Sequence, residues 1–254
     1  MNERIIFNGR SSEDFGLRVV CDNPFQTAER AVERYQISGR NGELIQDLGY
    51  YLNRTVTFRV AAYGLTQDAV DLTAQLAAWL QPDADYHRLE ETYNPDVFHM
   101  ARITSINPTQ IGYLYKNIEF ELAFDCMPQK FLKRGEATVE FSASAQGWKK
   151  LVNPTPRTAL PLIRFAHTIT QGVTDPETVI NFYGRGRETY IKCLANTPER
   201  EIEVDTETET ARFTDTGADA GQYIIFAGMP SLIAGQNDML TPMAVSMTPR
   251  WWRL

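Results

Sequence analysis

The chain has 254 residues, of which 43% are hydrophobic and 22% are charged, so it can form one large or two medium domains with an ordinary core. Its net charge of −7 argues against a protein that wraps nucleic acid, because phosphate neutralisation needs clustered lysine and arginine. Three widely spaced cysteines make a disulfide framework or a zinc site improbable and favour assembly in a reducing cytoplasm. We expect no cofactor and no metal, and no apolar run approaches the length that spans a bilayer.

The first part of the chain is predicted to consist mostly of strands. Arg4 to Phe7 and Phe15 to Val20 are short apolar runs separated by turn residues. Further on, residues 54–62 alternate cleanly, with valine and phenylalanine on one face and threonine and arginine on the other. This period of two predicts a half-buried strand.

Between these strands the sequence predicts an extended hairpin arm. Residues 31–38 alternate loosely, and Asn41-Gly42 favours the positive φ angles of a tight turn. The return strand, residues 43–51, is interpreted as polar and poorly patterned, so an isolated hairpin would be marginal and is expected to pack on another subunit. A solvent-exposed loop without a partner is the alternative. The residues predicted to form an oligomer interface are Ser38, Gly39, Arg40, Asn41, Gly42, Glu43 and Leu44.

One amphipathic helix follows. Thr66 is a plausible N-cap, Asp68 lies in the first turn where the helix dipole favours a carboxylate, and Pro82 marks the end. Five apolar residues recur at steps of three and four and form one stripe. They are Ala69, Leu72, Leu76, Trp79 and Leu80. We expect this helix to cover one face of a sheet.

Strands resume after the helix and lead into a second domain. Candidates at 86–91, 97–106 and 113–124 end at Asp125-Cys126-Met127-Pro128, which we expect to close the first domain. The serine, glycine, asparagine and proline content then rises. We therefore predict an N-terminal domain at 1–134, an extended connector at 135–156 and a C-terminal domain at 157–254. Short strands at turn-like spacing in the last segment predict a β-sandwich.

Catalytic and metal-binding patterns are absent from the sequence, so no catalytic, cofactor or metal residue is predicted. The histidines His87, His99 and His167 have no metal-ligand spacing. Cys126 as a nucleophile with His99 as its base has no local sequence signature to support it. We prefer to interpret Cys126 as a buried structural thiol. Gly184-Arg185-Gly186-Arg187 lacks the P-loop pattern and is interpreted as a hairpin turn.

Two further patterns in the sequence have an alternative interpretation as binding sites. The acidic stretch 199–209 departs from a calcium-binding EF-hand loop and is interpreted as a solvated strand–turn–strand. The aromatic residues Trp148, Tyr183 and Tyr190 could bind sugar on a sandwich domain, although such residues more often belong to a core or an interface.

Three groups of motifs follow one another along nearly the whole chain. They are Phe7-Asn8-Gly9 to Leu17 with Ile37 to Gly42; Tyr93 to Arg102 with Ile118-Glu119-Phe120 and Asp125 to Pro128; and Leu160-Pro161, Val204-Asp205 to Glu209, Gly235-Gln236-Asn237 and Pro249 to Leu254. Together, in this order, they resemble the distal tail protein family of long-tailed bacteriophages (siphophages). One departure is Cys126-Met127-Pro128, which stands where many relatives have an Asp-Pro pair.

The resemblance implies a fold and a role. The fold would be mainly β: an N-terminal β-sandwich with one α-helix and an extended hairpin arm, and a C-terminal galectin-like β-sandwich. Six copies would form a ring at the virion tail tip, assembled in the host cytoplasm, with the tail tube protein, tail-tip proteins and receptor-binding proteins as partners. DNA would pass through the channel only as cargo, and the protein would not be an enzyme.

The sequence is also compatible with two alternatives to this structural hub. The chain could be a carbohydrate-binding module protein that contacts the host cell wall, because a sandwich can carry a sugar site. A cell-wall hydrolase is the weakest alternative, because no pair of carboxylates can be singled out among 32 acidic residues.

Overall fold

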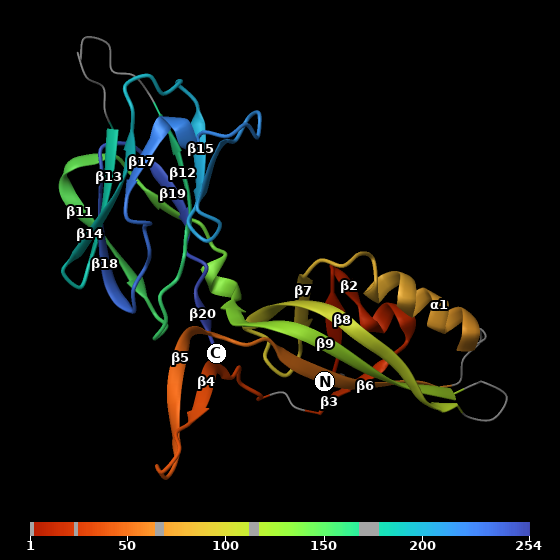
Figure 1. The fold of residues 1–254 in the computed structure, drawn as a ribbon. Helices are drawn as coiled ribbons and strands as arrows, with labels where there is room; N and C mark the ends of the chain where they lie inside the picture. The colour runs from red at the N-terminus through yellow and green to blue at the C-terminus, as the bar shows by residue number, and fades with distance from the viewer. Residues whose placement is uncertain (1–2, 23–24, 64–68, 112–116, 168–177) are drawn as a thin grey trace. The chain divides into compact units, whose positions relative to one another are not determined.

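A computed structural model describes residues 3–22, 25–63, 69–111, 117–167 and 178–254 (Figure 1). The chain divides into two compact units, Met1–Lys130 with Leu254, and Phe131–Arg253. The expected mainly β architecture with one α-helix is confirmed, and every strand pairing described is antiparallel. Among the described residues, no helix is long and apolar enough to cross a bilayer.

The first unit contains a sheet with the strand order β2-β1-β7-β8-β9-β6-β3. Its strands are β1 (Ile5–Phe7), β2 (Arg10–Ser11), β3 (Arg18–Cys21), β6 (Arg54–Tyr63), β7 (His87–Glu91), β8 (Val97–Ile111) and β9 (Asn117–Leu132). The alternation predicted for β6 is confirmed, because Val56, Phe58 and Val60 are all buried.

This sheet curls back on itself. Two strands, β7 and β8, separate β1 from β9, so a flat sheet would hold β1 and β9 about 14 Å apart. The rings of Phe7 on β1 and Phe124 on β9 nevertheless lie 5.3 Å apart, centroid to centroid. The predicted N-terminal sandwich is therefore, in the described residues, one curled sheet whose inner face forms the core.

Helix α1 (Ala69–Leu80) packs against this core (Figure 1). All five residues of the predicted apolar stripe are buried, which confirms the periodicity argument. Trp79 fixes the helix by donating its indole N–H to the carbonyl of Phe7 at 2.9 Å and by stacking on Phe15. The predicted cap residues Thr66 and Asp68 lie outside the described residues.

Strand β9 continues beyond the predicted end at Pro128 and reaches Leu132. Its pairing with β6 ends at the register pair Arg54 and Cys126. Beyond that pair, the missing N–H of proline removes no hydrogen bond to β6, so the strand tolerates it.

A second sheet in this unit is the predicted arm, formed by β4 (Arg30–Gln36) and β5 (Glu43–Tyr51) alone. The predicted tight turn at Asn41-Gly42 is wrong. Gln36 pairs with Glu43, so six residues connect the strands. Positive φ angles fall on Gly39 and Gly42, at 80° and 83°, and not on Asn41, because a turn from Ile37 to Arg40 closes first.

The second unit contains two five-stranded antiparallel sheets, as the predicted sandwich requires. One has the order β10-β19-β12-β15-β16 and the other β11-β18-β13-β14-β17. Their bounds are β10 (Val139–Phe141), β11 (Ser144–Asn153), β12 (Leu162–Ala166), β13 (Thr178–Gly184), β14 (Arg187–Cys193), β15 (Glu201–Asp205), β16 (Thr210–Phe213), β17 (Ile224–Ala227), β18 (Gly235–Thr241) and β19 (Val245–Thr248), with β20 (Trp252–Arg253) pairing with β9.

Two features of this unit test sequence interpretations. Gly184 pairs with Arg187 across a two-residue turn in which Arg185 and Gly186 have positive φ, so the interpretation as a hairpin turn is confirmed. The predicted connector at 135–156 is wrong over most of its length, because β10 and β11 lie within it and are both hydrogen-bonded into sheets. Apolar Trp148 and Val152 stand at exposed positions of β11, so the sequence does not show the alternation of a half-buried strand.

Candidate assembly interface

The arm presents an apolar face that the described contacts leave uncovered. Tyr35 and Leu44 are direct cross-strand partners and are 45% and 47% exposed. Leu48 lies on the same face of β5 by alternation and is 37% exposed. The interpretation of the return strand as polar is therefore wrong. Clustered exposed apolar side chains on a monomer mark an interaction surface.

The opposite face of the arm is charged and holds the two strands together. Arg30 donates two hydrogen bonds to Asp47, at 2.8 and 2.9 Å, and Arg34 lies 3.7 Å from Glu43. The hydrogen bond from Arg30 lowers the pKa of Asp47 below its usual value. Ile45 is an exception on this face, opposite Arg34 and 60% exposed. The hairpin therefore has a charged face and an opposite face on which the apolar side chains of Tyr35, Leu44 and Leu48 surround the polar pair Glu33 and Gln46.

The root of the arm is fixed on the first unit. Ala28 and Ala31 are buried, and Leu52 donates its N–H to the carbonyl of Glu29 at 2.9 Å. Just before the arm, the carbonyl of Gln26 accepts a hydrogen bond from the ammonium of Lys130 at 2.9 Å. A fixed root with an exposed apolar face is the geometry of an element that reaches another molecule.

Buried polar side chains lie beside this root. Arg54 is 5% exposed, and its Nη2 lies 2.8 Å from Nδ1 of His99, whose Nε2 lies 3.5 Å from Glu91. Burial lowers the pKa of His99 and raises that of Cys126 to about 12. A neutral buried thiol makes a poor nucleophile, which agrees with the structural interpretation of both residues.

The seven predicted interface residues lie at the tip of the arm and at the start of β5, and all are exposed. Leu44 alone among them contributes to the apolar face. Sequence reasoning missed Tyr35 and Leu48, because residues 43–51 are interpreted as polar although Leu44 and Leu48 fall on one face of the strand. The correct six-residue connection would have placed Tyr35 opposite Leu44.

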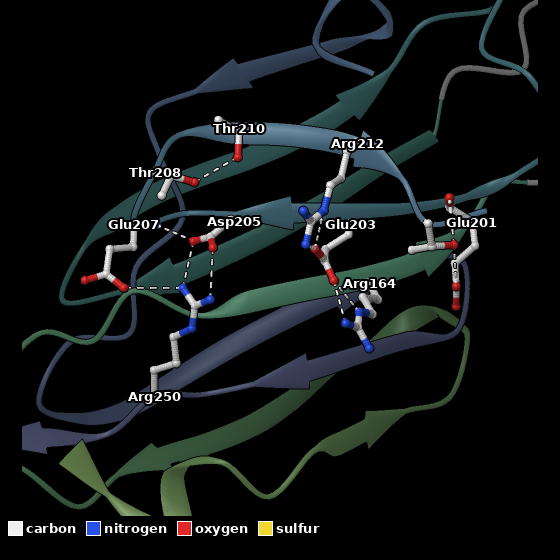
Figure 2. A network of polar contacts seen from close by, with 10 residues as sticks. Arg164, Glu201, Glu203, Asp205, Glu207, Thr208, Thr210, Arg212 and Arg250 are labelled. Atoms are coloured by element: carbon white, nitrogen blue, oxygen red, sulfur yellow. Dashed lines mark hydrogen bonds and ion pairs between the residues drawn. The ribbon is translucent and has the colours of Figure 1, made fainter. Parts of the chain in front are cut away.

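The acidic stretch 199–209 is a strand–turn–strand, as predicted, but its carboxylates are not simply solvated (Figure 2). Glu203 is 2% exposed and lies between two arginines from neighbouring strands. Arg164 on β12 donates to it at 2.6 Å, and Arg212 on β16 donates at 2.7 Å. Burial would raise the pKa of Glu203, but these hydrogen bonds outweigh it and hold the pKa below its usual value.

A second ion pair joins the C-terminal motifs. Arg250 donates to both carboxylate oxygens of Asp205, at 2.7 and 2.9 Å, and also faces Glu207 (Figure 2). Thr206 donates its hydroxyl to the carbonyl of Pro161 at 2.8 Å. The motifs around residues 160, 205 and 250 therefore meet in one place, where bidentate pairing fixes their geometry.

These carboxylates predict a loss of stability in acid. The folded-state pKa of Glu203 and of Asp205 lies below the usual 4.5 and 3.8; for Asp205 burial opposes the shift and Arg250 outweighs it. Such groups stabilise the fold above the unfolded-state pKa, and this contribution disappears as the pH falls. Urea unfolding from about pH 7 to about pH 3 should show stability falling below about pH 4.5. Glu203→Gln should flatten this fall, and an unchanged fall in that variant would contradict the assignment.

The remaining candidate residues fall in separate places. His87 contacts Asp83 at 2.7 Å, and His167 is buried in the second unit. Trp148 and Tyr183 come together with ring centroids 6.2 Å apart, whereas Tyr190 is half-buried on the neighbouring strand. Within the part of the chain that the structure describes, no group of three or more histidine, cysteine or acidic residues could hold a metal ion.

No protein-family model and no curated protein matches the chain. Several solved structures are similar to it. The Dit protein (gp 19.1) of SPP1, described as a paradigm of the hub adsorption apparatus in phages that infect Gram-positive bacteria, gives a TM-score of 0.73 at 13% identity over 97% of both chains. A chain of the phage P2 baseplate, solved in its activated conformation with Ca, gives a TM-score of 0.55 at 10% identity over 97% of both chains. A chain of the same baseplate solved with Sr gives a TM-score of 0.54 at 10% identity, over 97% of this chain and 96% of the baseplate chain.

At these identities the similarity establishes the fold. The match to SPP1 Dit extends over nearly the full length of both chains, so it includes both compact units. The chain has the fold of a phage distal tail protein, which confirms at the level of the fold the resemblance that the sequence motifs predict.

Proposed function

We propose that this protein is a structural hub at the tail tip of a long-tailed phage. Six copies form a ring that joins the tail tube protein above to tail-tip and receptor-binding proteins below. The region 1–134 builds the ring, and the C-terminal region lies outside it. The protein is not an enzyme, and it is assembled in the host cytoplasm before it functions in the virion.

The observation that carries this proposal is the full-length similarity to SPP1 Dit, whose published description names it a hub of the adsorption apparatus. The arm supports it independently. An amphipathic hairpin with a fixed root and an exposed apolar face can pair head-to-tail with the next copy, and such heterologous contacts close into a ring. The net charge of −7 suits a channel through which DNA passes without binding.

The oligomeric mass tests this proposal. One chain has a mass of 28.9 kDa, so a hexamer has a mass of about 170 kDa. We expect light scattering of the full-length protein at micromolar concentrations to give this mass, or twice this mass if two rings stack. A single species of one-chain mass across the concentration range would contradict the proposal.

A further inference from the structure

The outward face of the sheet β11-β18-β13-β14-β17 carries a hollow that the hub role leaves unused. It is open to solvent and has a volume of about 520 Å³. Two exposed aromatic residues and four polar residues line it. They are Trp148, Lys150, Tyr183, Glu188, Gln236 and Asp238.

The strand register explains why these residues gather. Asp238 on β18 is the cross-strand partner of Lys150 on β11 and of Tyr183 on β13, and Tyr183 in turn pairs with Glu188 on β14. Cross-strand partners point to the same face of a sheet. The register of β11 shifts just before Lys149, so Trp148 lies in an irregularity of the strand. Irregularities of this kind commonly re-aim a side chain at a binding site.

The two aromatic rings form an angled wall. Trp148 and Tyr183 are 46% and 44% exposed, and their planes meet at 62°. In many proteins, neighbouring aromatic side chains with this degree of exposure belong to a ligand-binding or interaction site. Asp238 faces the same hollow and is held by Gln236, whose amide donates to its two carboxylate oxygens at 2.9 and 3.1 Å. Oriented acceptors beside apolar rings suit a ligand that has both C–H faces and hydroxyl groups.

We propose that this hollow binds a neutral oligosaccharide. The apolar face of a pyranose ring stacks on Trp148 or Tyr183, and its hydroxyl groups donate to Glu188 and Asp238. A few oriented polar groups within an apolar wall are the usual composition of a small-ligand site. Two carboxylates beside one lysine give the hollow a formal charge of −1, which disfavours nucleic acid and phosphate-rich wall polymers.

This inference goes beyond the proposed hub role and does not depend on it. The full-length protein is mixed with N-acetylchitotriose, cellotriose or maltotriose at millimolar concentrations, and saturation-transfer NMR reports contact with each sugar. Light scattering of the same sample gives the oligomeric mass, so failure of sugar binding and failure of ring formation are distinguished.

We expect at least one of these sugars to bind and to shift the fluorescence of Trp148. Trp148→Ala and Tyr183→Ala should each weaken binding by about tenfold, since each removes one stacking surface. The matched control is Ile225→Ala on β17, a residue on the same sheet that is 45% exposed and lies outside the hollow. It should bind like the parent protein.

Three results would overturn the proposal. The first is that none of the three sugars binds. The second is that sugar binding persists unchanged in Trp148→Ala and Tyr183→Ala while circular dichroism shows that both variants are folded. The third is that poly(glycerol phosphate) binds and the sugars do not. Glu188→Gln provides a further variant, because it preserves shape and removes one acceptor, and it should weaken binding without a change in the melting temperature.

Discussion

Leu44→Glu is expected to purify as a folded monomer where the parent protein forms a ring. Leu44 lies on the apolar face near the tip of the arm, opposite Tyr35, and is 47% exposed in the single chain. A carboxylate there costs the monomer little, because exposed substitutions usually change stability by less than about 0.5 kcal/mol. In a ring the same carboxylate is buried without a partner in every interface, which costs several kcal/mol each time.

The neighbouring residue provides the matched control. Ile45→Glu removes an even more exposed apolar side chain, but it places the new carboxylate on the charged face opposite Arg34. We expect this variant to keep the ring. Light scattering and circular dichroism separate assembly from folding for both proteins. Equal loss of the ring in the two variants would show that the arm does not assemble through its apolar face.

Gly135→Ala is expected to cause the largest loss of stability from a single methyl group. A Cβ at Gly135 would lie 2.4 Å from the backbone nitrogen of Trp251, which is closer than two such atoms can approach. Trp251 cannot move freely, because two backbone hydrogen bonds hold this segment. The carbonyl of Trp251 accepts from the N–H of Leu132 at 2.8 Å, and the backbone N–H of Arg250 donates to the carbonyl of Gly135 at 2.8 Å. We expect a loss of about 3 kcal/mol, which lowers the melting temperature by about 10 °C.

Gly221→Ala is the control for this substitution. Its new Cβ would lie 3.1 Å from Oδ1 of Asp219, which accepts a hydrogen bond from the N–H of Gly221 at 2.8 Å and needs to shift by only a few tenths of an ångström, and the backbone of Gly221 is not in the left-handed region. We expect a change of less than about 1 kcal/mol. If thermal unfolding shows the two variants equally stable, then the contact between Gly135 and Trp251 does not constrain the fold.

Local patterns predicted the elements that have a strong periodicity. The five-residue stripe of α1 and the alternation of β6 each need only one stretch of sequence, and both are confirmed. The hairpin at Gly184 also followed from local chemistry, because two residues with positive φ complete it.

Features that depend on register could not be predicted in this way. The cross-strand pairing of Tyr35 with Leu44 depends on the six-residue connection, because a two-residue turn would pair Tyr35 with Leu48 instead. The ion pairs of Glu203 join residues that lie 39 and 9 positions away, so they require the order of three strands to be known. The strand β11 escaped prediction because its register shifts just before Lys149.

Closure of six copies of this chain into a ring can be seen directly by electron microscopy. Negative-stain electron microscopy of the purified full-length protein should show six-fold rings around a central hole. The Leu44→Glu protein, imaged at the same concentration, should show only small single particles. Fields of small single particles for the parent protein at every concentration, or equally abundant rings for Leu44→Glu, would contradict the account.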